Sequence, residues 1–227
     1  SAAALPQERP AEASVRPGRC GVAQASEAHV IAPVTLSGRH VTLVPLSQDH
    51  APALAEAVRD GELWRLWYTS VPRPEEVAGE IDRRLGLQAA GSMLPFAVLD
   101  AAGVPVGMTT YMNIDLTVPV VEIGSTWYAR RVQRAGLNTE AQLLLLGHAF
   151  DELDCACVQL VTHFHNVQSR RAIERLGAKL DGVLRAHRRM PDGTLRDSAC
   201  YSILAAEWPA VRSHLTFQLD RPTRATR

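Results

Sequence analysis

The hydrophobic residues of this chain follow two spacings that alternate along the sequence. Short alternating or continuous apolar runs predict strands at 34–46 (a strand or a hairpin), 93–100, 104–115, 119–129, 157–164, 180–190 and 194–204. A spacing of three to four residues predicts helices at 47–60, 74–91, 137–150, 166–177 and 206–219. Helices come first, a meander of strands follows, and the chain then runs β–α–β–α–β–β. This order predicts a mixed-sheet α/β (α+β) domain and not a doubly wound nucleotide-binding fold.

The two ends of the chain differ in composition from its middle. Residues 1–32 are rich in alanine, proline, serine and charge, and they lack an apolar block of signal-peptide length. We expect these residues to form a disordered N-terminal arm. Residues 219–227 are expected to form a basic, frayed tail. A single folded domain is therefore predicted between residues 33 and 218.

Composition narrows the classes of function. Lys+Arg 24 balances Asp+Glu 24, so no global charge draws the chain to nucleic acid or to a membrane. The longest apolar runs are too short to span a bilayer. Cys155 and Cys157 form one closely spaced pair, but no second pair completes a zinc site. We therefore expect reduced thiols in a cytoplasmic protein that binds no metal, nucleic acid or membrane.

The segment from Arg130 to Phe150 joins a strand, a basic turn and an apolar helix. The first N–H groups of a helix have no partner within the helix, and its dipole favours negative charge there. Gly136 lets the backbone approach a ligand closely, and Arg131 and Arg134 add positive charge. The turn matches neither a Walker loop nor the G-x-G-x-x-G pattern. From these residues alone, a phosphate site and an ordinary basic helix start are equally supported.

Two ordered motifs resemble those of the GNAT superfamily of N-acetyltransferases. The segment Gln133–Asn138 is similar to its acyl-CoA signature, Gln/Arg-x-x-Gly-x-Gly/Ala. Downstream, Asn166, Ser169, Gly177 and Gly182 resemble the next block of the RimJ/RimL-like branch, and the likeness covers roughly residues 34–217. It implies a mixed, mostly antiparallel sheet of about seven strands with helices on both faces. In this family the fourth and fifth strands splay apart.

The resemblance also implies a cosubstrate, acetyl-CoA, and residues that hold it. The pantetheine is expected between the strands Val120–Tyr128 and Cys157–Phe164. Backbone N–H groups at Gly124 or Ser125 would stabilise the oxyanion that forms on the thioester carbonyl. The residues expected to bind the cosubstrate are Arg131, Arg134, Ala135, Gly136, Leu137, Asn138, Thr139, Asn166 and Ser169.

An amine must be neutral to attack, so the resemblance implies a base and a proton donor. Glu122 is the candidate base, and its other interpretation is a solvent-facing or paired strand acid. Many relatives use a tyrosine as the donor, where this chain has Ile173. The RimJ/RimL-like branch has a serine instead, which corresponds to Ser169. The alternative interpretations are a backbone-capping hydroxyl for Ser169 and a plain helix cap for Asn166.

The acceptor site is less well defined by the sequence. Trp64, Trp67 and Tyr68 have helical spacing, which first indicates core packing. In the family that the chain resembles, the early helices wall the acceptor pocket, so these three aromatic residues are also candidates to contact the substrate. Tyr111 and Asn113 are weaker pocket candidates. Two histidines, at 163 and 165, could bind a metal, but no third ligand is near in sequence, and structural or cleft-lining roles are preferred. Beyond Gly182, some relatives carry a carboxylate. This chain has basic residues there, namely Arg185, His187, Arg188 and Arg189, which suggests an acceptor that carries an acid.

Taken together, these features predict an N-acetyltransferase with a primary amine as acceptor. A protein N-terminus, a peptide or amino acid, and a small amine all remain open. So do transfer of succinyl or another acyl group, and a catalytically silent acyl-CoA-binding module. Ile173 and Asn138 depart from the family pattern and keep the silent module open. Relatives often pair, so a homodimer is also possible.

Overall fold

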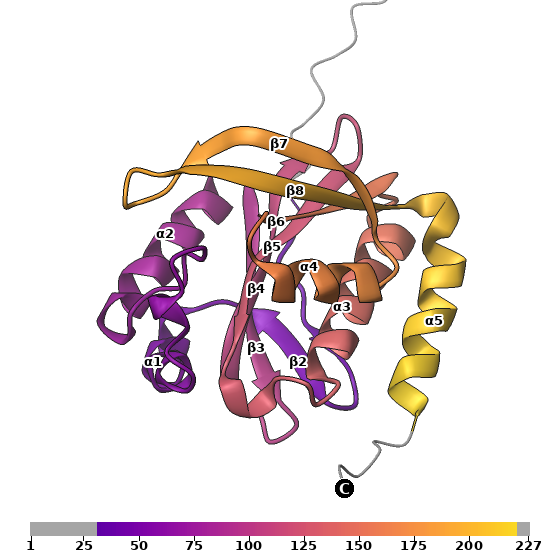
Figure 1. The fold of residues 1–227 in the computed structure, drawn as a ribbon. Coiled ribbons are helices and arrows are strands. Elements are labelled where there is room, and N and C mark those ends of the chain that lie inside the picture. Colours follow the sequence, from indigo (N-terminus) through magenta and orange to yellow (C-terminus); the bar gives the residue numbers. More distant parts are fainter. Residues whose placement is uncertain (1–30, 222–227) are drawn as a thin grey trace, which may run out of the picture.

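An eight-stranded sheet runs through the described part of the chain, residues 31–221 of a computed structural model (Figure 1). The strand order is β1-β2-β3-β4-β5-β6-β8-β7, and only β5 and β6 are parallel neighbours. A two-residue strand, β1, accounts for one strand more than expected, and it forms the predicted hairpin with β2. The strands are β1 Leu36–Ser37, β2 Val41–Pro45, β3 Met93–Asp100, β4 Pro105–Asp115, β5 Val120–Tyr128, β6 Cys157–His163, β7 Lys179–Arg189 and β8 Leu195–Leu204.

Helices cover both faces of the sheet, as the sequence predicted. Helices α1 and α2 pack against β4 and β3 on one side, while α3 packs against β1, β2 and α5 on the other (Figure 1). Helix α4 lies against β6. The helices are α1 Ala51–Arg59, α2 Val77–Ala89, α3 Leu137–Gly147, α4 Val167–Arg175 and α5 Trp208–Asp220.

Local signals explain several helix boundaries. Gly91, just past α2, has a φ of 74°, which a glycine adopts without the steric cost that a Cβ brings. Pro209 occupies the first turn of α5, where its missing N–H is harmless. Trp208, beside it, is 4% exposed and stacks on Phe150 with ring centroids 5.5 Å apart. Burial of these rings ties α5 to the end of α3.

The aromatic stripe of Trp64, Trp67 and Tyr68 does not form the helix that its spacing suggested. Only a 3-10 turn, Leu63–Arg65, is present. Gly61, just before it, has a φ of 102°, so the backbone leaves the helical path at this point. Trp67 is 55% exposed and is therefore not a core residue, which corrects the first interpretation of the stripe.

The parallel pair β5–β6 separates after three residue pairs. The pairing runs from Val120 opposite Cys157 to Glu122 opposite Gln159, and beyond this point β5 and β6 are not paired. Each strand keeps its other neighbour, because β5 stays paired with β4 and β6 with β8. The sheet therefore opens at its centre.

The expected arm and tail fall mostly outside the described residues. Of the arm, Ile31 is described, and it is 8% exposed within the hydrophobic core. At the other end, α5 continues to Asp220. Within residues 31–221, no helix is both long and apolar enough to cross a membrane.

Candidate active site

A cleft of about 830 Å³ opens where β5 and β6 separate. The N-terminal ends of α3 and α4 border this cleft, together with the loop that follows the 3-10 turn at Leu63–Arg65. Residues predicted for the site that line the cleft are Tyr68, Gly124, Arg134, Gly136, Asn138, Thr139, Asn166 and Ser169. One cavity thus brings together side chains from four distant parts of the sequence.

The turn before α3 has the backbone of an anion-binding loop. Gly136 has a φ of 82° and precedes the first helical residue. Arg134 has a φ of 64°, which is unusual for a residue that carries a Cβ. Within the described residues, no side chain caps the start of α3. Gln133 closes the turn, because its Nε2 donates to the carbonyl of Tyr128 over 2.9 Å. The first N–H groups of α3 are thus available to a ligand.

Three residues predicted to bind the cosubstrate do not line the cleft. Asp60, at the end of α1, accepts hydrogen bonds from the backbone N (2.9 Å) and Nη1 (3.4 Å) of Arg131. Leu137 is 4% exposed and points into the core. Ala135 does not line the cleft either. Arg131 and Leu137 thus hold the shape of the turn that presents Arg134 and Gly136.

A bulge in β5 lies at the edge of the cleft. Met108 pairs with Trp127 while Thr110 pairs with Gly124, so β5 carries one extra residue between them. Within this bulge Ser125 has a φ of 48°. A Cβ added to Gly124 would lie 2.8 Å from the sulfur of Met112, so a side chain here would displace Met112.

Glu122 lies beside this bulge on the opposite face of the sheet from α3. Glu122 is only 6% exposed, and its carboxylate accepts a hydrogen bond of 2.6 Å from Nδ2 of Asn113. Burial raises the pKa of Glu122, while Asn113 and the charges of Arg188 and Arg196 lower it. A Cβ on Gly124 would lie 3.2 Å from Oε1, so this carboxyl adjoins the bulge. Asn113 therefore supports Glu122 directly.

At the start of α4, the helix cap is Asn166. Its Oδ1 accepts a hydrogen bond of 3.0 Å from the backbone N of Ser169. The capping role considered for Ser169 is therefore filled by another residue. Ser169 and Ile173 both line the cleft.

Comparison with known proteins places these features in a family. The sequence profile of the acetyltransferase (GNAT) domain matches residues 40–179. The chain belongs to the GNAT acetyltransferase family. It is thus an acyl-CoA-dependent N-acetyltransferase by family, and the fold expected from the two sequence motifs is confirmed.

Individual relatives agree with this membership. A GCN5-related N-acetyltransferase from Brucella melitensis is 32% identical, with a TM-score of 0.75 over 84% of this chain and 87% of that one. The YdaF protein of Bacillus subtilis (strain 168), named provisionally as a ribosomal N-acetyltransferase, is 32% identical over 102 residues. That alignment covers 45% of this chain and only 55% of YdaF.

A third relative is similar in fold. It is RimJ of Mycobacterium smegmatis, solved in complex with CoA-disulfide, at 20% identity and a TM-score of 0.70 over 84% of this chain and 96% of that one. The relative named for ribosomal N-acetylation agrees with the RimJ/RimL-like branch expected from the sequence, and the RimJ structure agrees in fold.

The GNAT core contains one functional candidate that the sequence interpretation missed. Arg84 of α2 is 2% exposed, and its Nη2 donates to the carbonyl of Ser125 in the bulge over 3.0 Å. Its Nε donates to Glu80 over 2.7 Å, and its Nη1 has no partner among the described residues. The spacing of Val77, Ile81 and Arg84 places this arginine on the buried stripe of α2, which was the available signal.

The acceptor-side candidates separate into two groups. The rings of Trp67 and His163 meet edge to face with centroids 5.0 Å apart, and Tyr68 lies 6.3 Å from His163. Tyr111 does not belong to this pocket, because it is fully buried and donates to the carbonyl of Leu145 over 2.5 Å. Trp64 packs partly against the core.

The histidine pair at 163 and 165 lies in this aromatic cluster. The ring centroids of His163 and His165 are 5.6 Å apart, and the backbone N of His165 donates to Nδ1 of His163 over 3.1 Å. Within residues 31–221, no three His, Cys, Asp or Glu side chains are placed to hold a metal ion together.

Proposed function

We propose that this chain transfers an acetyl group from acetyl-CoA to a primary amine by direct attack in a ternary complex. One observation carries the proposal: β5 and β6 separate immediately after the pair Glu122–Gln159, beside an uncapped helix start at Gly136. The cleft connects these two features. Together they provide an anion site and an unpaired strand edge within one cavity.

The cosubstrate would be held mainly by backbone groups. The N–H groups at the start of α3 and the side chain of Arg134 would bind the pyrophosphate. Beyond Glu122 the unpaired edge of β5 offers hydrogen bonds to the amides of the pantetheine arm. The N–H groups around Gly124 and Ser125 would then lie near the thioester carbonyl, where negative charge develops.

Proton movements are assigned to two residues. Glu122, directly or through a water, would take a proton from the acceptor ammonium, and burial raises the pKa of this carboxyl toward the range useful for a base. The neutral nitrogen attacks the carbonyl carbon, the C–N bond forms, the C–S bond breaks, and the nitrogen releases its second proton to solvent. Ser169 lines the cleft and would pass a proton to the leaving thiolate while regaining one from water. Holding amine and thioester together supplies much of the acceleration.

The acceptor is a primary amine, and a protein N-terminus is one candidate. Support for it comes from a relative named provisionally as a ribosomal N-acetyltransferase. Ile173 lies on the cleft where many GNAT enzymes carry a donor tyrosine, which favours the alternative of a silent acyl-CoA-binding module. The two functions differ in whether the thioester is ever cleaved.

One assay separates these functions. Purified protein is incubated with acetyl-CoA or succinyl-CoA and a panel of peptides, amino acids and small amines, and released thiol is followed. Amine-dependent thiol release with acetyl-CoA, together with the acetylated amine by mass spectrometry, would support the proposal. Binding of acetyl-CoA without thiol release for any amine would support the silent module, and faster release from succinyl-CoA would reassign the donor.

A further inference from the structure

The β7–β8 hairpin carries two arginines on the face of the sheet that includes Glu122. In the ladder Arg188 pairs directly with Arg196, and Gly182 pairs with Cys200 on the same face. The β6–β8 register places His163 opposite Ser198, and Gln159 opposite Ser202, so this face continues to Gln159 and its partner Glu122. The arginines and the proposed base thus share one surface.

These two arginines are arranged at a cost to stability. Like charges directly opposite one another in a sheet are destabilising. Burial and the charge of Arg188 lower the pKa of Arg196, while Glu122 and Cys200 raise it. The Nε of Arg196 is buried and has no partner among the described residues. A local arrangement that opposes stability is typical of a functional site.

The two other arginines of the hairpin already have partners. Arg185 forms an ion pair with Asp197 at 2.6 Å, and Asp197 also accepts from the backbone N of Ala186. Arg189 donates to the carbonyl of Gly193 over 2.9 Å in the turn of the hairpin. Within residues 31–221, neither Arg188 nor Arg196 forms an ion pair of this kind. The pair therefore keeps a positive charge that Glu122 offsets only in part.

Aromatic rings form one side of this surface. Burial, followed by the charges of Arg196 and His165, lowers the pKa of His163, so its ring is neutral at neutral pH. Trp67 packs against both histidines, with ring centroids 5.0 Å and 5.8 Å away. An acceptor placed here would meet aromatic rings on one side, Glu122 at its amine and the two guanidinium groups farther out.

We propose that Arg188 and Arg196 form an anion subsite for the acceptor, which therefore carries a carboxylate or phosphate within a few bonds of its reactive amine. This inference rests on the proposed function, because it takes Glu122 to mark the position of the amine. A free amino acid, through its α-carboxylate, and a peptide with an acidic residue near its N-terminus share this chemistry. The subsite distinguishes them only by the reach between amine and anion.

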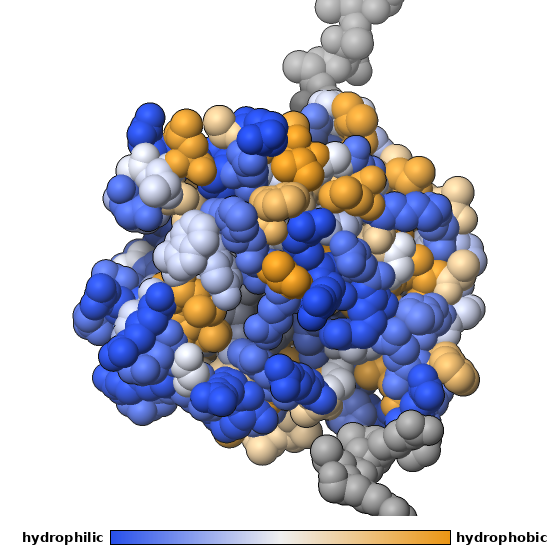
Figure 2. All heavy atoms as spheres, in the orientation of Figure 1, coloured by the Kyte–Doolittle hydropathy of each residue, from blue (hydrophilic) through white to orange (hydrophobic). Residues whose placement is uncertain are grey.

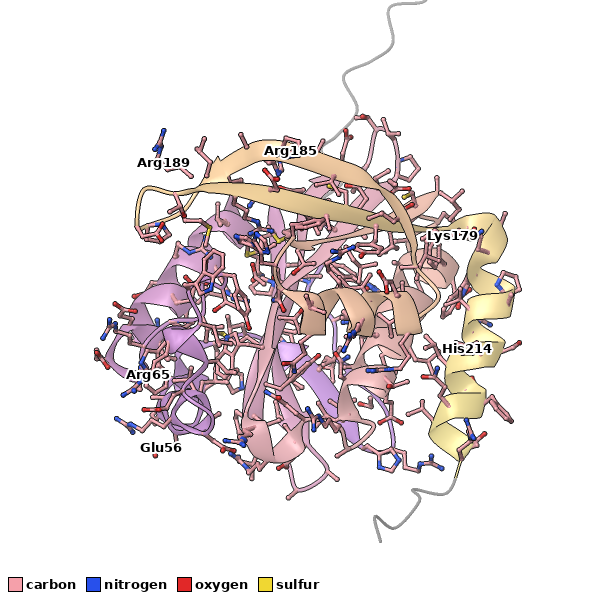
Figure 3. All side chains as sticks on the ribbon, viewed as in Figure 1. Glu56, Arg65, Lys179, Arg185, Arg189 and His214 are labelled. Atoms are coloured by element: carbon pink, nitrogen blue, oxygen red, sulfur yellow. The ribbon has the colours of Figure 1, made fainter. Side chains whose placement is uncertain are left out.

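The test compares acceptors that differ by one negative charge, and kcat/KM is expressed per neutral amine because a nearby carboxylate also raises the pKa of the amine. Glycine is paired with glycinamide, and amidated Ser-Glu is paired with amidated Ser-Gln, so that the two sources of the anion are separate arms. In each arm kcat/KM is measured for the wild type, Arg188→Gln, Arg196→Gln and Arg189→Gln. Arg189 neighbours Arg188 but projects from the tip of the hairpin away from the domain, so it is a matched control for charge (Figure 3). Arg188 and Arg189 are exposed, so we expect Arg188→Gln and Arg189→Gln to fold normally.

In at least one arm the acidic acceptor should be preferred by roughly 10- to 100-fold, as expected for a charge-assisted hydrogen bond. Arg188→Gln and Arg196→Gln should bring this ratio close to one, and Arg189→Gln should leave it unchanged. Equal kcat/KM for both members of both pairs would overturn the subsite while leaving acetyl transfer intact. So would a preference that survives both substitutions.

A second readout does not depend on turnover. It is used if no acceptor is acetylated, a result that would contradict the proposed function itself. The N-acetylated products of the same pairs are titrated into protein saturated with CoA, and the shift in Tm is recorded. A larger shift for the acidic products that disappears in Arg188→Gln supports the subsite independently of turnover. Equal shifts for acid and amide, or none, overturn it.

Discussion

Nη2 of Arg84 donates a hydrogen bond to the carbonyl of Ser125 over 3.0 Å, joining the buried side of α2 to the bulge in β5. The guanidinium is 2% exposed, and burial lowers its pKa while Glu80 raises it. A buried charge needs such partners, because leaving it unpaired is strongly destabilising. The bulge that would face the thioester is therefore fixed from behind by a charged side chain.

Arg84→Met should loosen this bulge. We expect kcat to fall roughly 10- to 100-fold, since small misplacements of reacting groups carry costs of this size. The KM for acetyl-CoA should change little, because the turn at Gly136 is untouched. Steady-state kinetics with both substrates measure the split. Arg83→Met is the matched control, as Arg83 also pairs with Glu80 but lies exposed, and equal losses of kcat in the two variants would contradict the positioning role.

Glu122→Gln should remove the acidic limb of the pH profile. Burial raises the pKa of Glu122 above its ordinary value of 4.5, so kcat/KM of the wild type should fall as the pH drops through that raised pKa. At neutral pH the variant should lose roughly 100-fold or more in kcat/KM, the usual contribution of a positioned base. A variant with an unchanged limb would remove Glu122 from the mechanism.

The same pKa shift predicts an effect on stability. A carboxyl whose folded-state pKa is raised stabilises the fold below its unfolded pKa of about 4.5, and this contribution is lost as the pH rises through the folded value. Glu122→Gln should therefore gain in Tm relative to the wild type at neutral pH, with the gain vanishing near pH 4. Thermal unfolding followed across this range measures it. A gain that is constant with pH would show that the charge of Glu122 is not the cause.

Gly136→Ala should impair the binding of acetyl-CoA specifically. At a φ of 82° an alanine is strained by roughly 1 kcal/mol, and relief of the strain would turn the N–H groups of the loop away from the pyrophosphate. We expect KM for acetyl-CoA to rise roughly tenfold, the equivalent of about 1.4 kcal/mol. Gly103→Ala is the control, because Gly103 has a φ of 78° and open space for a Cβ. Both variants should lose similar stability, and a rise in KM in both would contradict a special role for Gly136.

Residues that act through the local backbone were accessible to sequence interpretation. The turn at Gly136, the bulge near Gly124 and the β7–β8 hairpin turn at Gly193 are all marked by glycine, which permits conformations that other residues avoid. Two of these glycines, Gly124 and Gly136, line the cleft. These signals depend only on neighbours in the sequence.

Contacts between distant elements were not accessible in the same way. The spacing of Arg84 places it on the buried stripe of α2, but the sequence does not say that this stripe packs its guanidinium against the bulge in β5. Tyr111 alternates correctly along β4, but the sequence does not say which face α3 covers. Trp67 has helical spacing in a segment where Gly61 stops the helix. In each case the side chain is placed by an element from elsewhere in the chain.

Tyr111→Phe should therefore lower the stability of the fold, whereas Trp67→Ala should weaken binding of the acceptor. Tyr111→Phe removes a buried hydrogen bond to Leu145, so we expect a loss of about 1 kcal/mol, or roughly 2–4 °C in Tm, with unchanged kcat/KM.

Trp67 is 55% exposed beside His163, so Trp67→Ala should keep its Tm but raise KM for the acceptor. Phe217→Ala is the control for loss of an exposed aromatic ring, because Phe217 lies on α5 and is 64% exposed. Figure 2 shows that hydrophobic residues, in orange, also lie on the surface of the protein. Thermal melts and acceptor kinetics on the three variants measure both effects. A large change in acceptor KM for Tyr111→Phe would return that residue to the pocket, and an unchanged KM for Trp67→Ala would exclude the indole from it.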